Sequence, residues 1–493
     1  MKNIKYIAIV ALGLIACEPE LDNSITDGGV YTSGDVDLSN YVAVGNSLTA
    51  GYSDGALFIN GQNNSYPNLM ANRFALAGGG AFNQPMVNDN LGGLLMGGTQ
   101  IQETRLVLSG SNQASLAPVR LSGTPTTDIT NVLSGNFNNM GVPGAKSFHL
   151  LANGYGNVAG VPLGAANPYF VRFASDPNTS VIADAVVQNP SFFSLWIGNN
   201  DVLSFATSGG VGVDQTGNID PSTYGSNDIT DPNVFAATYQ ALLGQLTANG
   251  AKGVVMNLPA VTSIPYFTTV PYNPIPMDAA TAGAVNSGYA TYNGALNAAV
   301  GLNMITAAEA AKRTINFTAG QNAVVIEDES LTDLSALGPV PNIRMATAND
   351  LIVLPARVVI GTEATPGNPA TVYGVGTPLS DHLVLTENEI AMIAAAQNAY
   401  NATISALASS NPDVIMVDVK AIMEQLANGG LSYDGGMLTN AYATGGAFSL
   451  DGVHPTARGY ALIANAVIEK MNMEFGGTIP MVNPGTYPTI YLN

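Results

Sequence analysis

The feature that most constrains the fold is a set of short, predominantly apolar segments. Four of them have the length of a single strand: Tyr41–Val44, Phe192–Ile197, Val254–Leu258 and Val414–Val419. A strand with apolar residues on both faces needs cover on both sides, which is typical of parallel sheets. These segments therefore predict a buried parallel sheet.

Helical patterns separate these segments. Phe235, Tyr239, Leu242 and Leu246 follow one another at i, i+4, i+7 and i+11, which places them on one helix face. The same spacing recurs over residues 390–407 and 460–471, and Thr456 is a plausible N-cap of the last helix. Strands that alternate with amphipathic helices predict an α/β fold, in which ligands bind at the carboxyl ends of the strands.

The chain is longer than a minimal sheet of this kind requires. It has 493 residues, of which 46% are hydrophobic and only 10% are charged, enough for a large core. Three stretches rich in Gly, Pro, Asn, Ser or Thr interrupt the pattern, at 76–130, 205–233 and 337–380. We expect them to be loops, lids and a small β-rich appendage inserted into one domain, 38–475, which a C-terminal tail, 476–493, follows.

The first residues resemble a bacterial lipoprotein signal. Lys2 and Lys5 precede an apolar run, and the run ends in "LIAC" at Cys17, the chain's only cysteine. We expect a signal peptide at 1–16, lipidation of Cys17, and an acidic flexible tether at 17–37. The product would be anchored in the bacterial envelope, in the outer membrane, facing the periplasm or the outside. The alternative is an ordinary signal peptide with an incidental cysteine.

Charge and composition exclude several classes of partner. The formal net charge of −20 disfavours binding to nucleic acid and docking on anionic bilayers. No later segment reaches the ~18 continuous apolar residues of a membrane span. The acidic stretch at 212–233 has oxygen ligands but no EF-hand spacing, so we expect a solvated loop and no metal site. We expect a monomer.

A serine stands where the first predicted strand ends. Ser47 lies in "GNSLTAG", and a serine becomes a useful nucleophile when a base accepts its proton. Of the three histidines, His454 follows Asp451 by three residues in "LDGVH", a spacing that lets the carboxylate reach Nδ1 and leaves Nε2 free. His149 lies in an apolar run and His382 in a loop before a helix, so we expect structural roles for both.

Two other turns offer hydrogen-bond donors for a developing oxyanion. Gly144, in "NMGVPGAKS", presents its backbone N–H without a side chain in the way. Asn200, in "GNND", offers its side-chain amide after the strand at 192–197. Taken singly, each stretch is more simply explained as a turn.

Taken in order, the stretches "GNSLTAGY", "NMGVPGAKS", "GNND" and "DGVHPTARGY" resemble the GDSL/SGNH hydrolases. The resemblance implies a flavodoxin-like three-layer α/β/α sandwich and cofactor-free hydrolysis of esters. It implies Ser47 as the nucleophile and an oxyanion donor through its own N–H, Gly144 and Asn200 as the other donors, and His454 with Asp451 as base and orienter. One departure is Asn46, where the family usually has aspartate before the serine.

The substrate is less tightly specified. The apolar segments 91–96 and 257–276 suit an acyl chain or a lid, but for most of their residues the favoured interpretation is packing on the core or on each other. Trp196 is the only tryptophan, so no extended aromatic platform for sugars is evident. We expect a small-molecule or lipid carboxylester as substrate. The alternatives are a carbohydrate O-deacetylase of the same family and a non-catalytic surface lipoprotein that binds lipid or glycan. An adhesive protein with an incidental motif is a further alternative.

Overall fold

A five-stranded parallel sheet forms the centre of the computed structural model, which describes residues 30–110 and 116–491. Its strand order is β15-β8-β7-β1-β6, and every neighbouring pair is parallel. All residues of β1 and β7 are buried, as expected for strands covered on both faces. The prediction of an α/β fold with a central parallel sheet is confirmed. The strands are β1 (Tyr41–Gly45), β6 (Asn139–Gly141), β7 (Phe192–Trp196), β8 (Lys252–Met256) and β15 (Val414–Val417).

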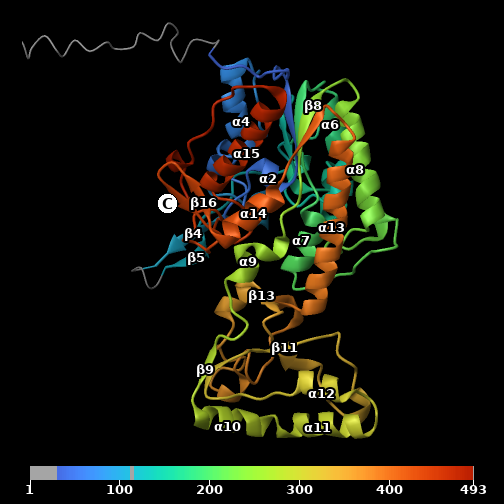
Figure 1. Ribbon diagram of the computed structural model, residues 1–493, viewed down its shortest axis with the longest axis vertical. Coiled ribbons are helices and arrows are strands. Elements are labelled where there is room, and N and C mark those ends of the chain that lie inside the picture. Colours follow the sequence, from blue (N-terminus) through green and yellow to red (C-terminus); the bar gives the residue numbers. More distant parts are fainter. Residues whose placement is uncertain (1–29, 111–115, 492–493) are drawn as a thin grey trace, which may run out of the picture.

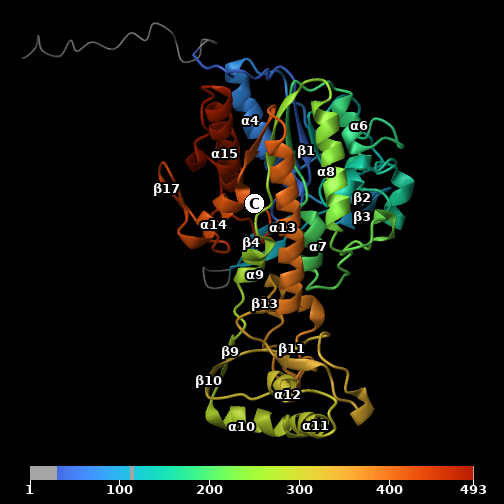
Figure 2. The same cartoon turned by 45° about the vertical axis from the view of Figure 1, so that its right-hand side comes forward.

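Helices lie on both sides of this sheet (Figure 1). One side carries α4 (Tyr66–Phe74), α14 (Val419–Asn428) and α15 (Ala457–Phe475), and the other carries α6 (Val181–Val186), α8 (Pro232–Thr247) and α13 (Glu387–Ser409). Figure 2 shows the same two groups from another angle. The helices predicted over 235–246, 390–407 and 460–471 are confirmed as α8, α13 and α15. Thr456 caps α15 by accepting the N–H of Gly459 at 3.0 Å.

The carboxyl ends of the strands meet at one edge of the sheet. There β1 passes into the short helix α2 (Ser47–Ala50), and β7 passes into α7 (Asn200–Thr207). The loop at 142–147 follows β6, and the segment at 257–276 follows β8. Because all five strands run the same way, the residues after each strand gather at this edge.

The inserted stretches take different forms. Residues 76–130 contain two hairpins, β2 (Leu94–Met96) with β3 (Thr99–Gln102), and β4 (Leu106–Ser109) with β5 (Ala117–Arg120). Residues 205–233 complete α7 and form the loop before α8. Residues 337–380 belong to a lobe at the bottom of Figure 1, which also includes α10 (Ala279–Gly288), α11 (Ala290–Gly301) and α12 (Ala307–Arg313). The lobe is therefore longer and more helical than the β-rich appendage that the sequence predicts.

The lobe has short two-stranded sheets and a small core of its own. Its strands are β9 (Ile275–Met277) with β10 (Gly320–Asn322), β11 (Val325–Glu327) with β12 (Ile343–Met345), and β13 (Leu351–Ile352) with β14 (Val384–Leu385). Its core is formed by Leu296, Ala299, Ile305, Ala310 and Leu334. The long helix α13 leads from the lobe back to the sheet, where it packs against β15 and α8 (Figure 1).

The ends of the chain are described only in part. The predicted signal peptide, Cys17 and most of the tether lie outside the described residues. Within the described ranges, no helix combines the length and the apolar character needed to cross a bilayer. The segment after α15 packs back on that helix, because Ile479 and Val482 are buried and bond to Asn472 and Asn465.

Candidate active site

Ser47 is the first residue of α2, immediately beyond β1. The turn before it is tight: a side chain at Gly45 would come within 2.5 Å of the Trp196 carbonyl oxygen. Asn46 caps α2, since its Oδ1 accepts the N–H of Leu48 at 3.0 Å. Its Nδ2 lies 3.4 Å from Oδ1 of Asn199, the residue that precedes α7. Asn46 thus serves as both the cap and a link to the neighbouring strand end.

His454 bonds to Ser47 although the two residues are 407 positions apart. Its Nε2 lies 2.9 Å from Ser47 Oγ, and its Nδ1 lies 2.8 Å from Asp451 Oδ2. The Asp–His pair is built locally: Asp451 Oδ1 accepts the backbone N–H groups of Val453 and His454, both at 2.9 Å. This turn places the Asp451 carboxylate beside the His454 imidazole, as the three-residue spacing predicts.

The Asp451 carboxylate has further donors from outside its turn. Gly55 donates its N–H to Oδ2 at 2.8 Å, and Ser449 donates its hydroxyl to Oδ1 at 3.1 Å. Only 13% of the Asp451 side chain is exposed. Burial acts to raise the pKa of Asp451, but the charge of His454 and the hydrogen bonds from His454 and Val453 outweigh it and bring the pKa to about 2. The carboxylate is therefore ionised at neutral pH.

Two residues near the triad were not identified from the sequence. The ring of Tyr52 lies with its centroid 4.7 Å from that of His454 and covers one side of the imidazole. Asp54 is 2% exposed, and its Oδ1 accepts the N–H of Leu450 at 2.9 Å. Burial, reinforced by the negative charge of Asp451, raises the pKa of Asp54 to about 7. No sequence spacing indicates either contact, because both partners lie about four hundred residues away.

Gly144 and Asn200 line the same hollow as Ser47 and His454. Gly144 has φ +82°, a left-handed conformation that favours glycine. Asn200 Nδ2 donates one hydrogen to the Ala145 carbonyl at 2.9 Å, which leaves its second N–H for a ligand. Among the hydrogen bonds of the described residues, none uses the backbone N–H of Ser47 or Gly144. Three donors thus border one space beside the serine hydroxyl.

Asp201 fixes the loop that carries Gly144. This fully buried carboxylate accepts the N–H of Ser147 at 2.8 Å and its hydroxyl at 2.6 Å. The start of α7 and the loop after β6 are therefore held together by Asp201 and by the bond from Asn200 to Ala145. The sequence signal for this role is only its position next to Asn200.

The other histidines lie away from Ser47. His149 Nδ1 accepts the N–H of Lys146 at 3.1 Å, and its ring stacks on Tyr155 with centroids 4.8 Å apart. Burial and the Lys146 charge lower the pKa of His149 to about 4. His382 lies in the lobe, with Nδ1 3.2 Å from Ser380 Oγ. Both have the structural surroundings that the sequence predicts for them.

An apolar cavity of about 110 Å³ extends from the triad between α7, α14 and α15. Its apolar walls include Leu203, Ile422, Met423, Leu426, Leu462 and Ile463. The segment 257–276 contributes Pro259, Val261 and Ile264 to this wall. The other candidate, 91–96, does not line the cavity. There Leu94 is buried with Ala50 and Leu57 in a separate small core.

A second, more open hollow also adjoins the triad. Its walls are polar and aromatic and include Tyr52, Gln102, Gly144, Asn167 and Tyr169. The two spaces meet at Ser47 and His454, which line both of them. An ester carbonyl placed at the serine would thus have one apolar side and one polar side.

No family model, curated protein or solved structure matches the chain. What the site can do therefore follows from its geometry. A serine bonded to an imidazole, whose other nitrogen is held by an ionised carboxylate, can lose its proton as it attacks an electrophile. Donors beside that serine can stabilise the negative charge that forms on a carbonyl oxygen.

Proposed function

We propose that the protein is a serine carboxylester hydrolase of the GDSL/SGNH type. The observation that carries the proposal is the line from Ser47 Oγ through His454 to Asp451, with spacings of 2.9 and 2.8 Å, beside three convergent donors. The sheet gives further support. Numbered along the chain, its strands have the order 2-1-3-4-5, which is the order of flavodoxin-like sheets.

The reaction would have two stages. Ser47 Oγ attacks the ester carbonyl while His454 Nε2 takes the hydroxyl proton, and Asp451 stabilises the imidazolium. The carbonyl oxygen becomes an oxyanion, which the N–H groups of Ser47, Gly144 and Asn200 stabilise. The C–O bond breaks, and His454 returns the proton to the departing alcohol. Water then attacks the acyl-enzyme by the same route and releases the carboxylic acid and free Ser47.

The cavities indicate how the ester would lie. The apolar cavity suits the acyl chain, and the polar hollow suits the alcohol. The apolar cavity's volume of about 110 Å³ is several times the roughly 10–15 Å³ that holds a single water, so it has room for more than an acetyl group. We therefore propose medium-chain acyl esters as the preferred substrates. The polar and aromatic walls of the second hollow would also suit a sugar as the alcohol part of the ester. A carbohydrate O-deacetylase is therefore the second candidate function.

Hydrolysis of p-nitrophenyl esters from acetyl to palmitoyl tests the proposal, with the wild type compared with Ser47→Ala. We expect turnover that Ser47→Ala abolishes, with an optimum near the octanoyl ester. An optimum at acetyl would favour the deacetylase. Equal rates for the wild type and Ser47→Ala on every ester would leave a non-catalytic lipid or glycan binder as the better explanation.

Lipid anchoring at Cys17 is a separate proposal, because that residue lies outside the described residues. It rests on the "LIAC" resemblance alone. In cells that are fed an alkyne fatty acid, the wild-type protein should become labelled and the Cys17→Ser variant should not. The label is measured on the immunoprecipitated protein. Equal labelling of both would contradict the lipidation.

A further inference from the structure

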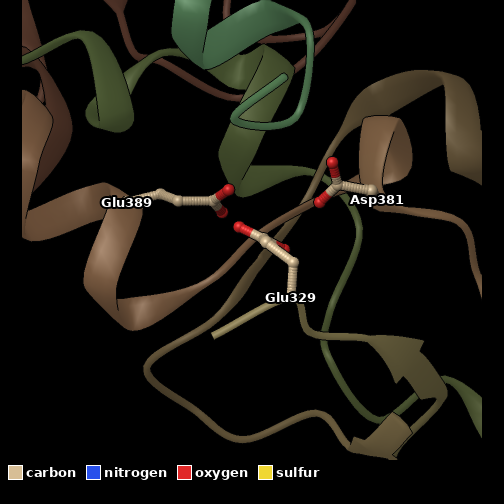
Figure 3. A group of neighbouring side chains, drawn as sticks. All are labelled: Glu329, Asp381 and Glu389. Carbon is tan, nitrogen blue, oxygen red and sulfur yellow. The ribbon is translucent and has the colours of Figure 1, made fainter. Parts of the chain in front are cut away.

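Three carboxylates converge where the lobe meets α13 (Figure 3). Glu329 follows β11, Asp381 begins the short 3-10 turn before β14, and Glu389 lies in the first turn of α13. One oxygen from each side chain lies within 4.8 Å of the oxygens from the other two. Figure 3 shows Glu389 and Asp381 directed towards Glu329 from opposite sides. Three separate chain segments thus bring negative charge to one point.

Glu389, the most buried of the three residues, has a carboxylate oxygen that accepts no hydrogen bond. Glu389 is 3% exposed, and its Oε2 accepts the N–H and hydroxyl of Thr386 at 2.6 and 2.9 Å. Its Oε1 is buried and has no hydrogen-bond partner, and the same holds for Oδ1 of Asp381. Within residues 30–110 and 116–491, no lysine, arginine or histidine forms an ion pair with any of the three carboxylates. A buried acceptor that is left unsatisfied is energetically costly.

Backbone packs tightly against this point. A side chain at Gly210 would place its Cβ 1.8 Å from Glu389 Oε1, and one at Gly209 would lie 2.4 Å from the carbonyl oxygen of Asp381. Both glycines follow α7 directly, so the cluster lies at the C-terminal end of that helix. A helix C-terminus carries partial negative charge, which favours a cation there.

Two buried acidic residues of the 212–233 loop, Asp228 and Asp231, do not share this arrangement. Asp228 accepts the N–H groups of Val213 and Gly225 and the side-chain amide of Gln215. Asp231 accepts the N–H groups of Gly217, Asn233 and Val234. These two carboxylates of the 212–233 loop therefore already accept hydrogen bonds from donors of the protein.

We propose that Glu329, Asp381 and Glu389 form a binding site for a calcium ion, independent of the ester-hydrolase function. Calcium binds hard oxygen ligands at 2.3–2.6 Å, so two ligands on opposite sides of the ion are about 4.6–5.2 Å apart. Separations of up to 4.8 Å between the three oxygens fall within that limit. Magnesium binds at shorter distances and usually keeps several waters, so it fits a site of three protein carboxylates less well.

The bound ion would join the lobe to the sheet domain. Glu329 and Asp381 belong to the lobe, whereas Glu389 begins the helix that returns to β15 and α8. Three carboxylates held this close together, with no cation of the described residues paired to them, repel one another unless a counter-charge is present. Calcium would supply that charge and hold the three segments together.

Isothermal titration of EDTA-treated protein with calcium chloride tests the site. Potassium chloride at about 150 mM suppresses weak binding to the acidic surface. We expect one ion per chain and, at saturating calcium, a rise in melting temperature of at least about 2 °C. Glu329→Gln and Asp381→Asn should each weaken binding at least about tenfold, since each removes a charged ligand. Because Glu329 is exposed, Glu329→Gln should disturb the fold less than Asp381→Asn does.

Glu387→Gln is the matched control. It also removes one negative charge, from the first turn of α13 that holds Glu389. Glu387 itself is exposed and accepts the side-chain amide of Asn349, outside the cluster. Its calcium binding should equal that of the wild type. Absence of binding heat, or equal binding by the wild type and both ligand variants, would overturn the site. A melting temperature that responds to pH but not to calcium would show that a shared proton occupies the cluster instead. A response to magnesium alone would overturn the assignment to calcium.

Discussion

The buried carboxyl group of Asp54 predicts that the protein loses stability as pH rises through neutrality. In the folded protein, burial raises the pKa of Asp54 from its ordinary 3.8 to about 7. In the unfolded chain the group has its ordinary pKa. Between these two values the native state holds a proton that the unfolded state has released. The free energy of unfolding therefore decreases with rising pH.

The size of the effect follows from the shift. Roughly three pKa units at 1.36 kcal/mol each correspond to about 4 kcal/mol of stability, which is fully present below the unfolded pKa and lost as pH rises through about 7. A protein with net charge −20 approaches its isoelectric point in acid, so measurements are better made from about pH 5.5 to about pH 8.5. About 2 kcal/mol of the decrease falls within that range.

Asp54→Asn isolates this contribution. Asparagine can accept the N–H of Leu450 as aspartate does, and it tolerates the left-handed φ of +52° at this position. Because it does not ionise, the wild type should lose about 2 kcal/mol more stability than the variant over this pH range. Urea unfolding followed by the fluorescence of Trp196, the chain's only tryptophan and 2% exposed, measures the difference.

Asp35→Asn is the control, because that residue is exposed and its removal should leave the pH dependence as in the wild type. Other buried carboxylates, such as Asp201, titrate in all three proteins and cancel in the comparison. Parallel loss of stability in the wild type and Asp54→Asn would refute the reasoning, because Asp54 would then not carry a proton at neutral pH.

Three further predictions concern the site. Asn200→Ala should lower kcat by about 10²–10³-fold with little change in KM, because the Asn200 amide would stabilise the transition state. A variant with the kcat of the wild type would show that Asn200 is not an oxyanion donor. Ile422→Trp should shift the optimal ester to a shorter acyl chain, because the indole fills the apolar cavity. Gln425 is exposed on the same helix, so Gln425→Trp should keep the wild-type optimum. The same optimum in Ile422→Trp as in the wild type would place the acyl chain outside this cavity. Asn46→Ala should lower the free energy of unfolding by about 1 kcal/mol through loss of the α2 cap. Asn46→Ser, which keeps an uncharged cap acceptor, should lower it less, and urea denaturation measures both changes.

Local pattern determined much of this protein. Four of the five sheet strands follow from short apolar segments of the sequence, and β6 was not predicted. The helices α8, α13 and α15 follow from the periodicity of apolar residues, since burial of one face depends mainly on spacing along the chain. The Asp451–His454 pair follows in the same way, because three residues close a turn whose backbone N–H groups hold the carboxylate. The order of the four motifs suggested the role of Ser47 before any contact was visible.

Tertiary structure alone decided the contacts between distant segments. Gly55 bonds to Asp451 across 396 positions, Tyr52 covers His454, and the walls of the apolar cavity come from α7, α14 and α15. The same is true of Glu329, Asp381 and Glu389, each of which is unremarkable in its own stretch of sequence. Periodicity specifies which face of an element is buried but not which distant element covers it. That choice depends on how the whole chain packs, and it places these side chains within reach of one another.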